Sequence, residues 1–427
     1  MPASLYSPAM STRTLHFTVL LSVAAGIFLS PGAAADDTVD KNHPLLAVLK
    51  QFESAAAKGP DEADLPVRKI PNFPIGTWPG KGLAQHPFLF YGEGNNVLYV
   101  VDHGQVVWTY AFPPGGEIDD AWMLTNGHII CTKMTDCYEV TPQKQIVWTY
   151  HCPPNTQIHA LQPVGLDQVM VVENGEPPHL YILNKKDNSK VLAHELPALS
   201  TDPKSIHGQF RNCRITAQGT YLLGFLTGGF INEYDKDWKQ IWTCPSPGPW
   251  SAVRLKNGNT LIPGDARGFV HEVNPQGQIV WAVESTTLPG IVLHDVQTAS
   301  RLANGDTLIC TRGNASKPKV PAPTTTAPSG TNPAAAATNA TASTAPATTP
   351  PVPPAPTAAA TNAPAQTAPA QTAPAPTAPP YVVQAVEITP DKKIVWVLQD
   401  YQDLPACTGI QLLDEPGTPE TPGALER

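Results

Sequence analysis

The stretch Asn274-Pro275-Gln276-Gly277-Gln278-Ile279-Val280-Trp281 decides the fold, because a tight turn leads at once into an apolar strand that carries a tryptophan. The same strand recurs at Val106-Val107-Trp108, Ile146-Val147-Trp148, Gln240-Ile241-Trp242 and Ile394-Val395-Trp396. Trp108 and Trp148 are 40 residues apart, and Trp242 and Trp281 are 39 apart. This period is typical of a four-stranded propeller blade.

Each clear repeat contains two turns at fixed positions. Residues 253–255 lead into Asn257-Gly258, which tolerates positive φ and suits a tight hairpin, and residues 260–262 form the return strand. A third strand at 269–273 and the turn at 274–277 complete the unit. Matching pairs of turns occur at Asn126-Gly127 with 141–144, and at Asn304-Gly305 with 389–392. We therefore predict four antiparallel strands per repeat.

The number of repeats predicts the size of the ring. Residues 159–196 and 207–244 fit two further, less regular blades, whereas residues 86–110 have room for only three strands. The apolar stretch 408–413 would supply the missing innermost strand and leave no open sheet edge inside the ring. We predict an all-β, six-bladed propeller whose first blade is closed by a C-terminal strand; five or seven blades are the alternatives.

The N-terminal residues predict export and a short helix. Residues 1–35 have a basic start, an apolar stretch at 17–29 and a small-residue cleavage site, as in a secretory signal peptide. A membrane anchor is the alternative, but the stretch is shorter than the roughly 20 residues of a spanning helix. Within the segment 36–85, residues 43–58 have apolar side chains at helical spacing. We expect this helix to dock on the ring; a separate partner-binding helix is the alternative.

The remaining boundaries follow from composition. Residues 86–314 and 381–414 form the predicted propeller, and 415–427 a C-terminal tail. Residues 315–380 consist almost entirely of Pro, Ala, Thr, Asn, Gln and Ser, so we expect a disordered insertion between the second and third strands of blade six. Loop closure entropy grows slowly with length, so this insertion should not break the ring. Two sequons, at Asn314 and Asn339, matter only in a host that glycosylates.

Charge and cysteine content exclude several classes of function. The net charge of −9, with basic residues scattered along the chain, gives no reason to expect nucleic acid or an anionic membrane as a partner. We expect an exported, periplasmic or extracellular protein without an integral membrane segment after cleavage. The seven cysteines include no Cys-x-x-Cys, so neither a zinc ribbon nor a redox motif is indicated. We predict no metal site and no cofactor. Cys131 and Cys137 flank a turn, and a disulfide across that hairpin is one alternative.

Polar residues at the start of the innermost strands define a candidate site. Loops that lead into these strands would bring their side chains to one rim of the central channel. This set comprises Asp119, Asp120, His159, His207, Trp250, His294 and Asp295, with Arg312 added by another loop on that rim. By strand periodicity His207 and Arg211 share a side, as do Trp250 and Arg254. Histidine and arginine together are suited to hold an anion. The alternatives are that these side chains cap loop carbonyls or that they simply line a water-filled channel.

The repeat resembles a known superfamily. The quoted stretch and Thr389-Pro390-Asp391-Lys392-Lys393-Ile394-Val395-Trp396 resemble the PQQ-like propeller repeat, over residues 86–413 apart from the insertion. Quinoprotein dehydrogenases of that superfamily are eight-bladed rings with adjacent cysteines over the quinone and a calcium site. This chain has no adjacent cysteines, so the resemblance implies the propeller without bound PQQ.

A second resemblance concerns activity. His294-Asp295, followed by the Asn304-Gly305 turn and Arg312, is similar to the pattern of bacterial arylsulfotransferases, which are exported six-bladed propellers. The resemblance implies that His294 is the nucleophile, that His207 and His159 are acid/base or anion-holding partners, and that Arg211 or Arg312 stabilises the transition state.

Two functions follow from these observations. We favour an exported module that binds a ligand or a protein through a funnel lined by His, Arg and Asp. The expected partner is a small anionic ligand, a glycan or a protein. The alternative is a sulfotransferase-like enzyme that uses His294. The residues proposed to bind ligand are Asp119, Asp120, Trp250, Arg254 and Asp295.

Overall fold

The computed structural model describes residues 43–56, 75–92, 96–200, 202–264, 267–312 and 381–427. All of them belong to one compact unit, Asp40–Arg427. The predicted signal peptide at 1–35 and the predicted disordered insertion at 315–380 lie outside the described residues. Within the described part of the chain, no helix has the length and apolar character needed to cross a membrane.

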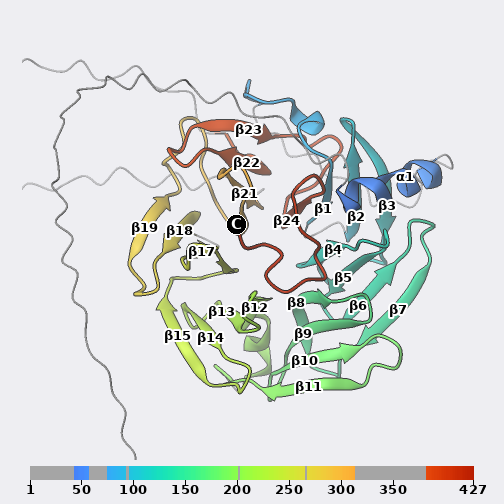
Figure 1. The fold of residues 1–427 in the computed structure, drawn as a ribbon, viewed down its shortest axis with the longest axis vertical. Helices are drawn as coiled ribbons and strands as arrows, with labels where there is room; N and C mark the ends of the chain where they lie inside the picture. The colour runs from blue at the N-terminus through green and yellow to red at the C-terminus, as the bar shows by residue number, and fades with distance from the viewer. Residues whose placement is uncertain (1–42, 57–74, 93–95, 201, 265–266, 313–380) are drawn as a thin grey trace, which may run out of the picture. The chain divides into compact units, whose positions relative to one another are not determined.

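The described chain folds into six four-stranded antiparallel sheets arranged as blades around a ring (Figure 1). Blade one contains β24 (Gly409–Leu412), β1 (Phe88–Tyr91), β2 (Val97–Asp102) and β3 (Gln105–Ala111). Blade two contains β4 (Ala121–Met123), β5 (Ile129–Lys133), β6 (Asp136–Val140) and β7 (Ile146–His151). Blade three contains β8 (Gln157–Val164), β9 (Gln168–Asn174), β10 (His179–Asn184) and β11 (Lys190–Glu195).

The other three blades have the same plan. Blade four contains β12 (Phe210–Ile215), β13 (Tyr221–Phe225), β14 (Phe230–Tyr234) and β15 (Gln240–Pro245). Blade five contains β16 (Val253–Arg254), β17 (Thr260–Gly264), β18 (Phe269–Val273) and β19 (Ile279–Val283). Blade six contains β20 (Val296–Arg301), β21 (Thr307–Thr311), β22 (Ala385–Ile388) and β23 (Ile394–Leu398). The predicted six-bladed propeller is confirmed.

Two pairings join segments that are far apart in the sequence. β24 pairs with β1, with Phe88 opposite Leu412 and Tyr91 opposite Gly409. The first blade is therefore closed by the C-terminal strand, as predicted. In blade six, β21 pairs with β22, with Thr307 opposite Ile388. The two strands on either side of residues 313–380 are thus direct neighbours in one sheet.

The repeated tryptophan and the repeated turn contact each other across blade boundaries. The indole Nε1 of Trp108 donates to the Pro142 carbonyl at 2.8 Å, and that of Trp281 donates to the Pro390 carbonyl at 2.8 Å. Trp242 makes the same bond to Pro275 at 2.9 Å. Each proline lies in the turn between the third and fourth strands of the next blade. Each of these hydrogen bonds joins two adjacent blades, and the Trp108 bond is buried.

A cation and a carboxylate reinforce the same boundaries. Glu272 of blade five accepts from Arg301 of blade six at 2.6 Å, and the Arg301 guanidinium lies 5.0 Å from the Trp281 ring centroid. Arg254 of blade five pairs in the same way with Glu233 of blade four and lies over Trp242. Arg254, predicted to bind ligand, is therefore part of a contact between blades.

The N-terminal helix docks on the ring. α1 (Pro44–Ala56) places Leu45, Val48, Leu49 and Phe52 in one buried cluster with residues of blades one and two. The Phe52 ring meets the Trp108 ring edge-on, with centroids 5.3 Å apart. The predicted helix and its predicted docking are confirmed, since its apolar side is buried against the blades.

The predicted disulfide between Cys131 and Cys137 is wrong. Cys131 is opposite Tyr138 and Cys137 is opposite Thr132 across the β5–β6 pair. Opposite residues share a face of the sheet and their neighbours point to the other face, so the two thiols lie on opposite faces. They accordingly belong to two different hydrophobic clusters. All seven cysteines, every one of which lies in the described residues, are free thiols.

The C-terminal tail, residues 413–427, closes one end of the central channel (Figure 1). In five blades the N–H group at the start of the turn between the first two strands donates to this tail. The donors are Thr125, Gly165, Ala217, Lys256 and Ala303, and the acceptors are oxygens of Glu420, Glu426, Arg427 and Glu415. A cavity of about 90 Å³ remains beneath the tail. We call this end of the channel the tail mouth.

His86 links the tail mouth to the closure of the ring, and we expect it to make stability depend on pH. Its ring nitrogens lie 2.9 Å from Asp414 Oδ2 and 3.1 Å from Glu387 Oε2. Burial alone would lower the pKa of His86, but the hydrogen bonds and charges of Asp414 and Glu387 raise it from 6.5 to about 9. A raised pKa in the folded state stabilises the protein fully below the unfolded pKa of about 6.5. This contribution is lost as the pH rises through about 9.

Urea unfolding of the wild-type protein and of His86→Gln between pH 6 and 9.5 measures this contribution. We expect the variant to be less stable by about 2–3 kcal/mol at pH 6, and the difference to shrink towards pH 9.5. His103→Gln is the control, because the His103 side chain is 84% exposed. If the wild type and His86→Gln differed in unfolding free energy by the same amount at pH 6 and at pH 9.5, the raised pKa assigned to His86 would be contradicted.

Candidate functional site

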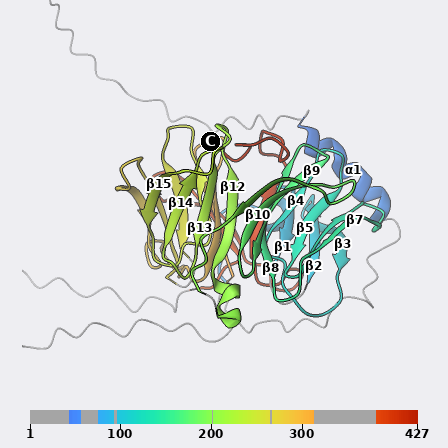
Figure 2. The same ribbon diagram turned by 90° about the horizontal axis from the view of Figure 1, so that it is seen from below.

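A cluster of charged and polar residues lies at the other end of the channel. Glu117 and Asp119 precede β4, Gln157 and His159 belong to β8, His207 belongs to η3 (Pro203–Gly208), and Arg211 belongs to β12. β8 and β12 run from this cluster to the turns that bind the tail, so the two ends of the channel are distinct. Figure 2 shows η3, a short green coil, on the face opposite the C-terminus. We call this end the η3 mouth and the six residues the histidine cluster.

His159 is the centre of the cluster and is almost fully buried. Its Nδ1 lies 2.5 Å from Asp119 Oδ2 and 2.6 Å from Arg211 Nη1. A guanidinium only donates and a carboxylate only accepts, so this nitrogen serves one partner at a time. Protonated, it donates to Asp119; unprotonated, it accepts from Arg211. The Arg211 guanidinium also lies 4.6 Å from the Trp250 ring centroid, which fixes it in place.

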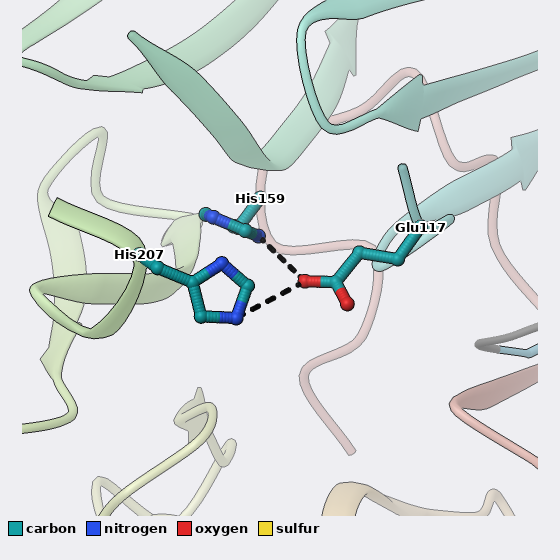
Figure 3. Close-up of side chains that lie close together, drawn as sticks. All are labelled: Glu117, His159 and His207. Atoms are coloured by element: carbon teal, nitrogen blue, oxygen red, sulfur yellow. Dashed lines mark ion pairs between the residues drawn. The ribbon is translucent and has the colours of Figure 1, made fainter. Parts of the chain in front are cut away.

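His207 and Glu117 form the outer part of the cluster (Figure 3). The His207 side chain is 44% exposed, and its Nε2 lies 3.5 Å from Glu117 Oε1. The same carboxylate oxygen lies 3.6 Å from His159 Nδ1 and 3.8 Å from Arg211 Nη1. The two imidazole rings meet edge-on, with centroids 5.0 Å apart. Solvent therefore reaches the cluster through His207.

Asp120 does not join this cluster. Its carboxylate forms two hydrogen bonds with Arg214 of blade four, at 2.8 and 3.0 Å, and accepts from the Leu161 N–H at 3.1 Å. Burial raises the pKa of Asp120, although the Arg214 charge opposes this shift. Asp120 thus connects blades two, three and four inside the channel, which is a structural role.

The predicted site residues of blade six form a second group. His294 Nδ1 lies 3.0 Å from Asp295 Oδ2, and Arg312 Nη2 lies 3.5 Å from the same oxygen. The Arg312 N–H also donates to the Asp295 carbonyl at 3.0 Å. His294, Asp295 and Arg312 thus contact one another on blade six, and His159 links His207 and Arg211 on blades three and four.

The predicted residues thus take part in three sets of contacts, one of which is the blade-six group of His294, Asp295 and Arg312. His159, His207, Arg211, Asp119 and Trp250 come together at the η3 mouth. Asp120 and Arg254 form ion pairs between blades. Glu117 and Gln157 were missed, although each lies two residues before a predicted residue, Asp119 and His159. The two-residue period of an extended chain places such neighbours on the same side and was the signal available.

Comparisons with known proteins support the fold. No protein-family model and no curated protein match this chain. A protein of unknown function from Bacteroides caccae is 18% identical, with 76% of this chain and 97% of that chain covered and a TM-score of 0.56. Virginiamycin B lyase from Staphylococcus aureus is 12% identical, with 54% of this chain and 80% of that chain covered and a TM-score of 0.39. BamB from Moraxella catarrhalis is 16% identical, with 51% of this chain and 61% of that chain covered and a TM-score of 0.35. The likeness to the Bacteroides caccae protein shows the fold alone.

Proposed function

We propose that this protein is a propeller-type binding module that holds a small anionic ligand at the η3 mouth. The proposal is carried by the burial of the Asp119, His159 and Arg211 side chains, which are 1%, 1% and 5% exposed. Burying charged groups is unfavourable, so such clusters are typical of functional sites. The tail occupies the other mouth, so a ligand would enter past His207.

The ligand class follows from the donors at this mouth. Arg211 offers a planar fork of N–H groups that matches a carboxylate, sulfate or phosphate. Trp250 restricts the guanidinium, so less conformational freedom is lost on binding. His207, at the edge of the cluster, would contact the ligand first.

Two further parts of the proposal rest on the sequence. The apolar stretch at 17–29 and the small residues that follow support export, to the periplasm or the exterior. The contact of Trp281 with the Pro390 turn involves the two residues that define the repeat, which supports membership of the PQQ-like superfamily.

Calorimetric titration of the protein with 4-nitrophenyl sulfate tests the proposed site. We expect binding by the wild-type protein and at least about a tenfold loss of affinity in Arg211→Met, because a charge-assisted hydrogen bond contributes roughly 1.5–3 kcal/mol. Arg267→Met is the matched control, since Arg267 is exposed. Equal affinity in both variants would sink the proposal. Release of 4-nitrophenol that depends on His294 would instead favour sulfuryl transfer.

A further inference from the structure

Three side chains of the histidine cluster are spaced as metal ligands. One ligand atom each from Glu117, His159 and His207 lies within 4.8 Å of the other two. Two of these separations are 3.5 and 3.6 Å, both measured from Glu117 Oε1 to a ring nitrogen (Figure 3). Zinc bonds of about 2.0–2.1 Å in tetrahedral geometry place neighbouring ligand atoms about 3.4 Å apart. The three side chains come from a loop, a strand and the short helix η3, so the fold itself creates this spacing.

Gln157 contacts, on each histidine, the ring nitrogen that faces away from Glu117. Its Oε1 lies 2.9 Å from His207 Nδ1 and 3.1 Å from His159 Nε2. An amide oxygen only accepts, so both nitrogens carry their proton when Gln157 has this orientation. The opposite nitrogen of His207, Nε2, then presents a lone pair towards Glu117. His159 Nδ1 does the same once it releases the proton that it donates to Asp119. Metal-binding histidines typically donate their other N–H to such a second residue.

The charge of the cluster favours an added cation. Glu117 and Asp119 carry two negative charges, and Arg211 carries one positive charge, so the sum with neutral histidines is −1. Asp119 Oδ2 lies 2.5 Å from His159 Nδ1, so a divalent ion on that nitrogen would replace the proton that is donated to Asp119. The ion would bring the sum to +1. The site would then suit an anionic ligand.

We infer that Glu117, His159 and His207 bind a divalent transition metal of the zinc class at the η3 mouth. A set of two imidazoles and one carboxylate leaves a fourth position open, as in zinc sites that accept an exogenous ligand. Solvent reaches the set at His207, its most exposed member. This inference deepens the proposed function, since the open position would hold the anionic group of the ligand. Arg211 competes with the metal for His159 Nδ1 and would pair with Asp119 instead.

Calorimetric titration of the chelator-treated full chain with Zn²⁺ alone tests the inference. We expect one ion per chain, and a loss of affinity of at least about 100-fold in His207→Ala and in Glu117→Gln. Gln157→Leu should weaken binding by about 10–100-fold. Arg211→Met should bind at least about tenfold more tightly, because it removes a positive charge 3.8 Å from the Glu117 ligand atom. Co²⁺ absorption reports the coordination geometry independently.

His294→Ala and His103→Ala are the controls, because both remove a histidine outside the cluster. Circular dichroism of each variant shows whether it is folded; His207 and Glu117 are partly exposed, so their variants should fold. Zinc affinity that is equal in the wild type, His207→Ala and Glu117→Gln would overturn the inference. Loss of zinc binding in a folded Arg211→Met variant would do the same. Zinc binding without 4-nitrophenyl sulfate binding would remove the proposed ligand and leave the metal site standing.

Discussion

Removal of residues 409–427 is expected to leave a chain that does not fold. These residues include β24, the innermost strand of blade one, whose Ile410 and Leu412 lie in a buried cluster with Phe88, Phe90 and Trp396. Without β24, the backbone groups of β1 lose their partners and the cluster opens to solvent. The loss should exceed the whole stability of a typical protein, about 5–15 kcal/mol. Far-UV circular dichroism and size-exclusion chromatography measure the outcome.

A shorter truncation is the control. Removal of residues 418–427 alone keeps β24 but deletes Glu420 and Glu426, which accept from Thr125 and Ala217. This variant should fold, with a lower melting temperature than the wild type. A cooperative, wild-type-like transition after removal of 409–427 would show that the ring does not depend on its closing strand.

Substitution of Asp120 by Ala is expected to destabilise the protein by about 3–5 kcal/mol. The change leaves the Arg214 guanidinium buried without its carboxylate and removes the acceptor of the Leu161 N–H. Breaking one partner of a buried ion pair typically has an effect of this size. Chemical denaturation with urea gives the free energy of unfolding of the variant and of the wild type.

Replacement of both partners is the informative comparison. Asp120→Leu combined with Arg214→Leu should lose less stability than Asp120→Ala alone, because no unpaired charge remains. Asp237→Ala is the control, since that side chain is 74% exposed, and a change below about 0.5 kcal/mol is expected. A loss below about 1 kcal/mol in Asp120→Ala would contradict the role given to this pair.

The ring could be predicted from the sequence because its signals are local. The Trp strand and the turns around Asn257-Gly258 and Pro275 recur in each clear blade, and a period of about 40 residues fixes the architecture. The closing strand followed from a count of strands, since only three fit between residues 86 and 110. The sequence did not predict the binding of the tail, because its acceptors contact N–H groups that every turn possesses.

The site could be predicted only in part. Histidines at the start of strands indicated the rim, and His159 and His207 do lie together. Which blades share a group depends on side-chain reach across the channel, which no local pattern encodes. For the same reason Arg254 could not be distinguished from a channel residue, because its partner Glu233 lies in the preceding blade. The disulfide prediction was wrong because the register of β5 and β6 places Cys131 and Cys137 on opposite faces of the sheet.

An anomalous difference map tests most directly the claim that the η3 mouth is a metal-dependent binding site. Crystals soaked in zinc chloride would be measured above and below the zinc absorption edge. We expect one strong peak bonded to the Glu117 carboxylate and to the rings of His159 and His207. Peaks at exposed histidines such as His103, with none among these three side chains, would contradict the account.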